Sequence, residues 1–179
     1  KKKIRTMKNK NIIFGTLIVG LISNTLSSNE KSSNRNFFKN LFTSKNEKNL
    51  NKSNKFLDKN KKNDTVIVTP SGLRYQIIKY GKKGKNPTEN DEVKVHYIGK
   101  FIDGTEFDSS YERGEPATFP LNAVIPGFTE GLKLMSIGSR YKFYIPPNLA
   151  YGEEGNSTIP PNSLLIFEVE LLEIIEDIN

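Results

Sequence analysis

Residues 124–135 read VIPGFTEGLKLM and form the one stretch after residue 65 in which apolar side chains repeat with helical spacing. Phe128, Leu132 and Met135 recur at i, i+4 and i+7, which places them on one face of a helix. Pro126 suits the first turn, where a missing N–H has no acceptor to lose, and we expect Gly138 to end the helix. The first turn also leaves backbone N–H groups near Ile125 without intrahelical partners. The sequence therefore predicts one short helix whose start could hold a carbonyl group.

The sequence on both sides of this helix alternates between apolar and polar residues, as strands with one buried face do. Strands are expected at 73–78 and 93–99 before the helix, and at 140–145 and 165–171 after it. Asp103-Gly104 predicts a two-residue hairpin turn, which makes the sheet antiparallel. About five strands and one short helix indicate an α+β fold. The loop 150–161 is long and bounded by Gly and Pro, and such loops often serve a site.

Composition divides the chain near Thr65. Residues 1–65 carry 16 Lys and Arg against 4 Asp and Glu, whereas residues 66–179 carry 11 against 16. The formal charge of +7 and the pI near 9.4 therefore reflect the first part. That part has no Tyr and no recognition motif, so we expect no nucleic-acid partner. The chain has no Cys and a single His, which excludes disulfides, thiol catalysis and a histidine-rich metal site, and we expect neither a metal nor a cofactor.

Residues 1–28 have the pattern of a signal peptide. Six Lys and Arg precede residue 12, and residues 12–22 form an apolar run. This run is shorter than the ~20 residues that span a hydrocarbon core. Because small residues follow it, a cleaved signal is favoured over a membrane anchor. We expect contact with a membrane only through an uncleaved leader.

Residues 29–65 are rich in Asn, Lys and Ser, with scattered apolar residues, so we expect this segment to be disordered. A signal peptide followed by a basic, acid-poor stretch resembles the two-part leaders that carry proteins through the secretory route into a secondary plastid. We therefore favour an apicoplast-like plastid, with a secreted or periplasmic protein as the alternative. Residues 66–179 are expected to form the folded domain.

Six short motifs occur in order within residues 66–179. They are Val95-His96-Tyr97-Ile98-Gly99, Asp103-Gly104 with Phe107-Asp108-Ser109-Ser110, Val124-Ile125-Pro126-Gly127-Phe128, Ala150-Tyr151-Gly152, Ile159-Pro160-Pro161 and Phe167-Glu168-Val169-Glu170-Leu171. In order and spacing they resemble the FKBP-type peptidyl-prolyl cis-trans isomerases, the bacterial-type members most. The resemblance implies a curved antiparallel sheet wrapped around the short helix, with a proline pocket between the sheet and the start of the helix.

The resemblance also implies which residues form the pocket. The catalytic residues would be Tyr97, Phe107, Asp108 and Tyr151, and the substrate-binding residues would be Phe119, Val124, Ile125, Phe128, Ile159 and Phe167. Phe128 stands where the family usually has Trp, and Ala117 stands where an aromatic residue is frequent. The loop after Tyr151 is one residue shorter than in the small eukaryotic immunophilins and lacks their His. These departures bear on affinity for the macrolide inhibitors tacrolimus and rapamycin.

Such a pocket can accelerate rotation of a prolyl bond without a nucleophile or a metal. The barrier of ~18–20 kcal/mol comes from amide resonance, which is lost when the bond is twisted. A water-poor apolar pocket then binds the twisted state better than the planar amide. We expect the Ile125 N–H and the Tyr151 hydroxyl to hold flanking carbonyls, and Asp108 to orient rather than transfer a proton. The expected substrates are proline-containing polypeptides.

Two alternatives stay open. Any one of the aromatic residues is explained equally well as a core residue of a small sheet domain, and Asp108 as the cap of a turn. His96 falls on an outward strand face, and we assign it no catalytic role. A function of another class is a chaperone-like module that binds proline-bearing or unfolded polypeptides without turning them over. Phe128 and Ala117 are the departures that keep this second function open.

Overall fold

The computed structural model of the chain describes residues 28–60 and 63–176. Contacts divide the chain into residues 1–42 and residues 43–179, and of the first unit only the beginning of one helix is described. The elements follow in the order α1(Ser28–Asn60), β1(Ile67–Val68), β2(Arg74–Lys79), β3(Glu92–Lys100), β4(Glu106–Ser109), β5(Ala117–Pro120), η1(Leu121–Ala123), α2(Pro126–Lys133), β6(Arg140–Ile145), η2(Pro147–Leu149) and β7(Leu165–Ile175). The expected signal peptide lies almost wholly outside the described residues.

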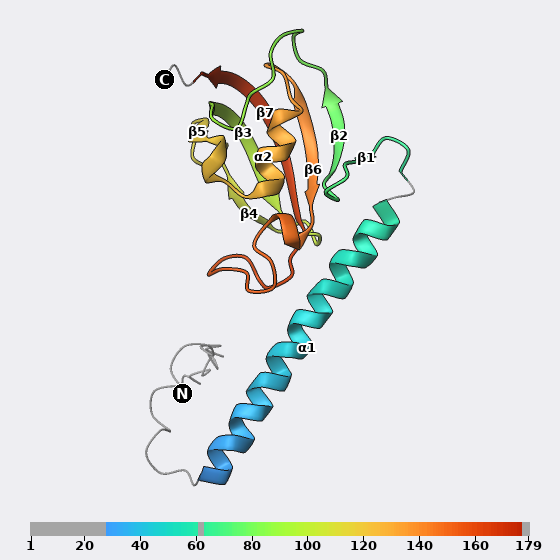
Figure 1. The fold of residues 1–179 in the computed structure, drawn as a ribbon, viewed down its shortest axis with the longest axis vertical. Helices are drawn as coiled ribbons and strands as arrows, with labels where there is room; N and C mark the ends of the chain where they lie inside the picture. The colour runs from blue at the N-terminus through green and yellow to red at the C-terminus, as the bar shows by residue number, and fades with distance from the viewer. Residues whose placement is uncertain (1–27, 61–62, 177–179) are drawn as a thin grey trace, which may run out of the picture. The chain divides into compact units, whose positions relative to one another are not determined.

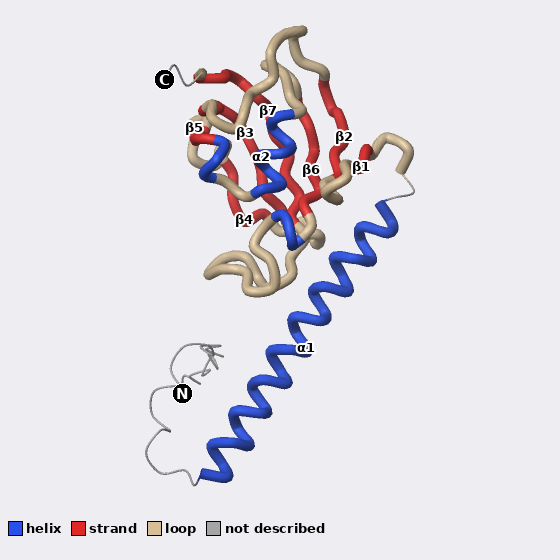
Figure 2. The backbone as a smooth tube through the Cα atoms, viewed as in Figure 1, coloured by secondary structure: helices blue, strands red, loops and turns tan. Residues whose placement is uncertain are grey.

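The strands form one antiparallel sheet in the order β1-β2-β6-β7-β3-β4, and β5 also pairs with β3 (Figures 1 and 2). The predicted α+β fold with an antiparallel sheet is confirmed. The described residues contain seven strands rather than about five, and one of the additional strands, β1, is only two residues long and too short to show alternation. The turn predicted at Asp103-Gly104 joins β3 to β4. Phe101 N–H donates to the Thr105 carbonyl over 2.8 Å, and Gly104 takes a φ of +88°, which favours glycine.

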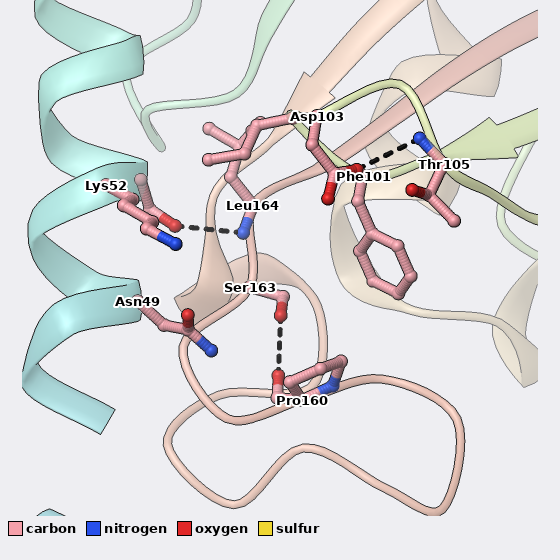
Figure 3. A pocket seen from close by; sticks show the side chains of 10 residues that line it. Asn49, Lys52, Phe101, Asp103, Thr105, Pro160, Ser163 and Leu164 are labelled. Carbon is pink, nitrogen blue, oxygen red and sulfur yellow. Dashed lines mark hydrogen bonds between the residues drawn. The ribbon is translucent and has the colours of Figure 1, made fainter. Parts of the chain in front are cut away.

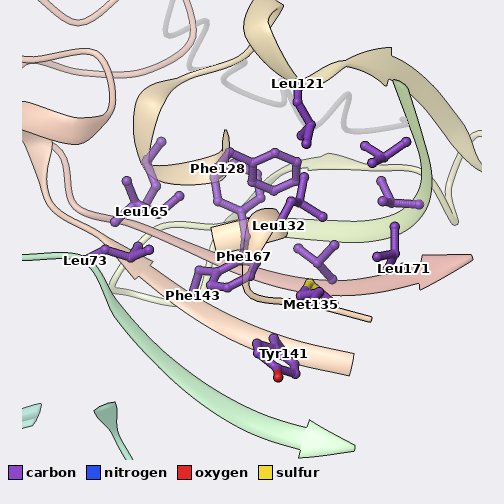
Figure 4. Close-up of a cluster of buried hydrophobic side chains, with 14 of the residues drawn as sticks. Leu73, Leu121, Phe128, Leu132, Met135, Tyr141, Phe143, Leu165, Phe167 and Leu171 are labelled. Atoms are coloured by element: carbon purple, nitrogen blue, oxygen red, sulfur yellow. The ribbon is translucent and has the colours of Figure 1, made fainter. Parts of the chain in front are cut away.

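The core lies between the sheet and α2. Phe128, Leu132 and Met135 are buried there, as their spacing predicted (Figure 4). Gly131 lets the helix approach the sheet closely, because a Cβ at this position would lie 2.7 Å from the Phe143 ring. The expected helix end at Gly138 is wrong. The last turn tightens as Leu134 N–H bonds to the Gly131 carbonyl, and Gly138 belongs instead to the turn before β6.

The expected disorder of residues 29–65 is wrong for residues 29–60, which belong to the single helix α1. No Gly or Pro interrupts residues 21–69, so nothing in the covalent chain breaks a helix there. The end of the helix also packs against the sheet within the unit 43–179. The ring of Phe56 lies 5.9 Å from that of Tyr144, and the Arg74 guanidinium donates to the Leu57 carbonyl. Tertiary contacts therefore support a helix that lacks an apolar stripe of its own.

A membrane-spanning helix is not found among the described residues, since none of them forms a helix that is both long and apolar enough.

Candidate active site

The ring of Phe128 lies in the middle of an aromatic group at the start of α2. Its centroid is 5.0 Å from that of Phe167 on β7 and 5.7 Å from that of Phe119 on β5. Tyr97 on β3 lies 6.1 Å away, edge to face. The side chain of Phe128 is only 5% exposed. Such offset and edge-on pairs stabilise one another, so the floor of this site is rigid and dry.

The group continues toward the β3–β4 turn. Phe107 meets Phe167 edge to face at 5.5 Å, and Phe101 lies 4.9 Å from Phe107. Both Phe107 and Phe167 press against Gly99 of β3, where a Cβ would come within 2.7 Å of the first ring and 2.9 Å of the second. Position 99 therefore needs a glycine, because any side chain there would collide with the rings of Phe107 and Phe167.

One side of the aromatic group ends in a polar cluster of Tyr97, Asp108 and Arg113. The Tyr97 hydroxyl donates to Asp108 Oδ2 over 2.5 Å, and Arg113 Nη2 donates to the same hydroxyl over 2.9 Å. Arg113 also forms an ion pair with Asp108, and its guanidinium carbon lies 5.5 Å from the centre of the Tyr97 ring. Each of the three groups thus holds the other two in place.

The environment keeps Asp108 ionised. Burial disfavours its charge, but the hydrogen bonds from Tyr97 and Arg113 and the charge of Arg113 outweigh burial and lower the pKa of the carboxyl. Burial, and then the hydrogen bond to Asp108, raises the pKa of Tyr97. At neutral pH the pair is therefore a carboxylate beside a neutral phenol. Neither group is prepared to exchange a proton with a substrate.

The start of α2 offers a free donor. The Ile125 carbonyl accepts from Phe128 N–H at 3.0 Å and from Thr129 N–H at 3.1 Å, which closes the first turn. The Ile125 N–H itself has no protein acceptor in the described part of the chain. Val124 and Ile125 are half-buried and pack against the same core as Phe128. This backbone donor can bind a carbonyl group at the rim of the aromatic group.

The loop between β6 and β7 contributes two of the expected residues, and they differ in their surroundings. Ile159 is 3% exposed and packs into the core cluster. Tyr151 is 40% exposed, and its ring pairs with no other ring of the described residues. Of the ten expected residues, five form the aromatic group (Tyr97, Phe107, Phe119, Phe128 and Phe167), and Asp108 bonds to Tyr97. Val124, Ile125 and Ile159 belong to the core cluster or pack against it, and Tyr151 lies at the surface.

Arg113 is the functional candidate that the sequence analysis missed. It lies in the polar loop after β4, five positions beyond the carboxylate that it contacts, and this opposite charge was the signal available in the sequence. His96 is also less isolated than expected. Its ring stacks on Tyr111 at 4.4 Å and its Nδ1 lies 3.0 Å from Ser110 Oγ. Both contacts support the loop that carries Arg113.

A separate cavity of about 560 Å³ lies beside the β3–β4 turn. Asn49 and Lys52 of α1, Phe101 and Asp103 of the turn, and Pro160 are among the residues that line it (Figure 3). Of the candidate site residues, none lines this cavity. In the part of the chain that the structure describes, no three His, Cys, Asp or Glu side chains gather in a way that could bind a metal ion.

A seven-stranded antiparallel sheet, a short helix and an aromatic group at the helix start define an FKBP-like domain. Residues 83–172 match the family model described as FKBP-type peptidyl-prolyl cis-trans isomerase. The chain belongs to this family. Residues 20–77 match a second model, described as the domain amino terminal to the FKBP-type isomerase, which covers α1 and was not expected from the sequence.

Bacterial relatives agree with the family assignment. The chain is 56% identical over 126 residues to the FKBP-type peptidyl-prolyl cis-trans isomerase FkpA of Aeromonas hydrophila, covering 70% of this chain and 47% of that protein. It is 55% identical over 122 residues to the FKBP-type 22 kDa isomerase of Escherichia coli strain K12, covering 68% and 59%. The chain thus spans about half the length of the curated relatives it matches.

Solved structures show the same fold. The crystal structure of FkpA from Escherichia coli superposes with a TM-score of 0.74 at 42% identity and covers 84% of this chain and 74% of that one. The isomerase of Pseudomonas syringae pv. tomato superposes with a TM-score of 0.67 at 33% identity and covers 73% and 96%.

Proposed function

We propose that this chain is a peptidyl-prolyl cis-trans isomerase whose substrates are proline-containing polypeptides. The observation that carries the proposal is the buried aromatic group centred on Phe128, with a free backbone donor at one rim and an ionised Asp108 at another. Membership of the isomerase family and the names of the relatives support it.

The mechanism needs only binding. The pyrrolidine ring packs on Phe128, with Tyr97, Phe119 and Phe167 around it, and water is displaced from the prolyl bond. Because the twisted amide carries less charge separation than the planar one, this dry surface stabilises the transition state more than the ground state. The Ile125 N–H fixes the carbonyl that precedes or follows the rotating bond. An acceleration of 10⁴-fold requires only about 5.5 kcal/mol of such differential binding.

Asp108 acts by charge and orientation in this proposal. Its carboxylate holds the Tyr97 hydroxyl, and Arg113 holds both, so the wall of the pocket keeps one shape through the rotation. No proton has to move, since the prolyl bond rotates without breaking. The donor role of Tyr151 requires its exposed side chain to turn toward bound substrate.

Macrolides are candidate ligands of the same pocket. Phe128 gives a smaller floor than the Trp that is usual in the family, and it lacks the indole N–H. Ala117 lowers one wall. We propose that tacrolimus and rapamycin bind more weakly here than to a pocket with Trp at this position.

The second candidate function is a binding module that holds proline-bearing polypeptides without turning them over. The exposed Tyr151 favours it, because a site that lacks this donor would bind the substrate and orient it poorly. NMR exchange spectroscopy of a short X-Pro peptide with the full chain separates the two. The proposed isomerase makes the cis and trans signals exchange faster at substoichiometric protein, whereas the module shifts the signals without faster exchange. The same peptide with Ala in place of Pro is the control for binding.

For the chain's organisation we propose a leader in residues 1–28 and an isomerase domain in residues 66–179. We propose that the protein enters an export route. A relative from Legionella longbeachae that is 45% identical over 134 residues bears the name outer membrane protein MIP, which supports a secreted or periplasmic protein. The plastid that the leader suggested finds no support among the bacterial relatives.

A further inference from the structure

Helix α1 carries a stripe of polar residues that faces the loop of the candidate site. The stripe consists of Asn46, Asn49 and Ser53, which recur at i, i+3 and i+7 and therefore share one face of the helix. All three lie in the unit 43–179, together with the sheet. The loop they face is the segment 150–164, which leads into β7.

Ser53 makes the central contact of this stripe. Its hydroxyl donates to the Asn162 carbonyl over 2.8 Å and accepts from Leu164 N–H over 3.1 Å. The residue is 1% exposed, so both bonds are shielded from water. Asn49 Nδ2 donates to the Pro161 carbonyl over 3.0 Å, one turn before Ser53. One hydroxyl and one amide thus bind three backbone groups within residues 161–164, at the end of the loop.

The loop end that they bind is also the point where the loop closes on itself. Asn162 N–H donates to the Gly152 carbonyl over 2.8 Å, which joins the two ends of residues 152–162. Asn162 has a φ of 56°, the only non-glycine residue with a positive φ in the described part of the chain, and it is buried. Such a backbone costs free energy and persists where its surroundings hold it in place. Ser53 binds the carbonyl of this same residue.

The closed loop carries two residues of the candidate site. Tyr151 precedes Gly152 directly, and Ile159 lies two positions before Pro161. Inside the loop, Gly155 N–H bonds to the Tyr151 carbonyl at 3.0 Å and Asn156 N–H bonds to the Ile159 carbonyl at 2.8 Å. If the backbone of Asn162 moves, these hydrogen bonds therefore move the backbone of Tyr151 and Ile159 as well.

We propose that Ser53, with Asn49, is a positioning residue for the isomerase site, and that α1 sets the geometry of the loop that carries Tyr151 and Ile159. The inference rests on the proposed function. It assigns to the amino-terminal helix a direct part in substrate binding, by hydrogen bonds to the loop rather than by contact with substrate.

Ser53→Ala in the full chain tests the proposal. It removes both bonds of the hydroxyl and leaves the amide and carbonyl of the loop unpaired, so we expect KM for an X-Pro peptide to rise about five- to tenfold with kcat nearly unchanged. Asn49→Ala should have a smaller effect in the same direction. Asn54→Ala is the matched control, because Asn54 is the next residue of α1 and is exposed.

Hydrogen exchange supplies a readout that does not depend on activity. The informative amides are those of Gly155, Asn156 and Asn162, whose acceptors all lie within the loop and not on Ser53. We expect them to exchange at least about fivefold faster in Ser53→Ala, while the amide of Val169 in β7 keeps its protection. Unchanged loop exchange, or an unchanged KM in a variant that has only lost thermal stability, would overturn the proposal. If the wild-type chain has no isomerase activity, the proposed function is refuted. The hydrogen-exchange comparison still tests separately whether Ser53 holds the loop in place.

Discussion

Replacing Phe128 by alanine should reduce isomerase activity far beyond its effect on folding. The ring is 5% exposed and contacts four other rings at 5.0 to 6.4 Å. A Phe→Ala change in such a position costs about 3–5 kcal/mol of stability. A domain with about 5–15 kcal/mol of stability then keeps about 0–12 kcal/mol, so the activity is compared under conditions in which the variant is folded.

The loss in rate follows from the role of the ring as the pocket floor. If the floor supplies about half of the roughly 5.5 kcal/mol that a 10⁴-fold acceleration requires, its removal lowers kcat/KM about 100-fold. NMR exchange of an X-Pro peptide measures this rate directly, at a temperature where circular dichroism shows the variant to be folded.

Leu132→Ala is the matched control for this prediction. Leu132 lies one turn further along α2, is completely buried, and belongs to no candidate site. Its truncation costs a similar amount of stability, about 2–5 kcal/mol, without changing the pocket floor. Equal activities for folded Phe128→Ala and Leu132→Ala would refute the assignment of Phe128.

Three further predictions concern charge and packing. Asp108→Asn should lower kcat/KM only about tenfold, because the pocket's dryness does most of the work; complete loss in a folded variant would indicate acid–base chemistry instead. The folded-state pKa of Asp108 is lowered, so its stabilisation is present above the unfolded pKa of about 3.9 and is lost as pH falls through the lower folded value. Urea titrations from pH 6 to 2 should therefore show a weaker pH dependence for Asp108→Asn, and identical pH profiles would contradict this. Gly131→Ala should destabilise the domain by about 1–3 kcal/mol in urea, since its Cβ would meet the Phe143 ring at 2.7 Å. Gly84→Ala, which has open space around it, should have little effect, and equal midpoints would argue against the close helix–sheet contact.

The sheet and α2 could be predicted because the residues that they bury recur in the sequence at the period of a strand or a helix. Val93, Val95 and Tyr97 alternate with polar residues on β3, and Phe128 and Leu132 repeat along α2, with Met135 at the same spacing just after it. Both periods follow from a side chain that must face either the core or water. Membership of the pocket was available only through resemblance to a family, because an inward-facing Phe has the same pattern whether it fills a core or lines a site.

Helix α1 could not be predicted because its contacts with the rest of the chain produce no hydrophobic periodicity in the sequence. Ser53 and Asn49 bind loop carbonyls that lie 109 and 112 positions later in the chain, and they do so through polar side chains. In the sequence, a polar helix face that bonds to another part of the chain has the same pattern as a polar face that is exposed to water. The contact between Arg113 and Asp108 was missed for a similar reason, since the path of the loop between them decides whether the two charges meet.

The strand order has a consequence for how this chain folds. Arg74 on β2 pairs with Tyr144 on β6, and Glu92 on β3 pairs with Ile175 on β7, so the β2–β6 and β3–β7 ladders join residues about 60 to 80 positions apart. Closing such long segments costs chain entropy before any ladder forms, which places folding in the millisecond-to-second range typical of non-local sheets. During synthesis β2 and β3 emerge well before β6 and β7, and they expose unpaired strand edges for that time. Until β6 and β7 have been made, these edges can pair with other chains, so we expect the incomplete chain to aggregate more readily than the complete one.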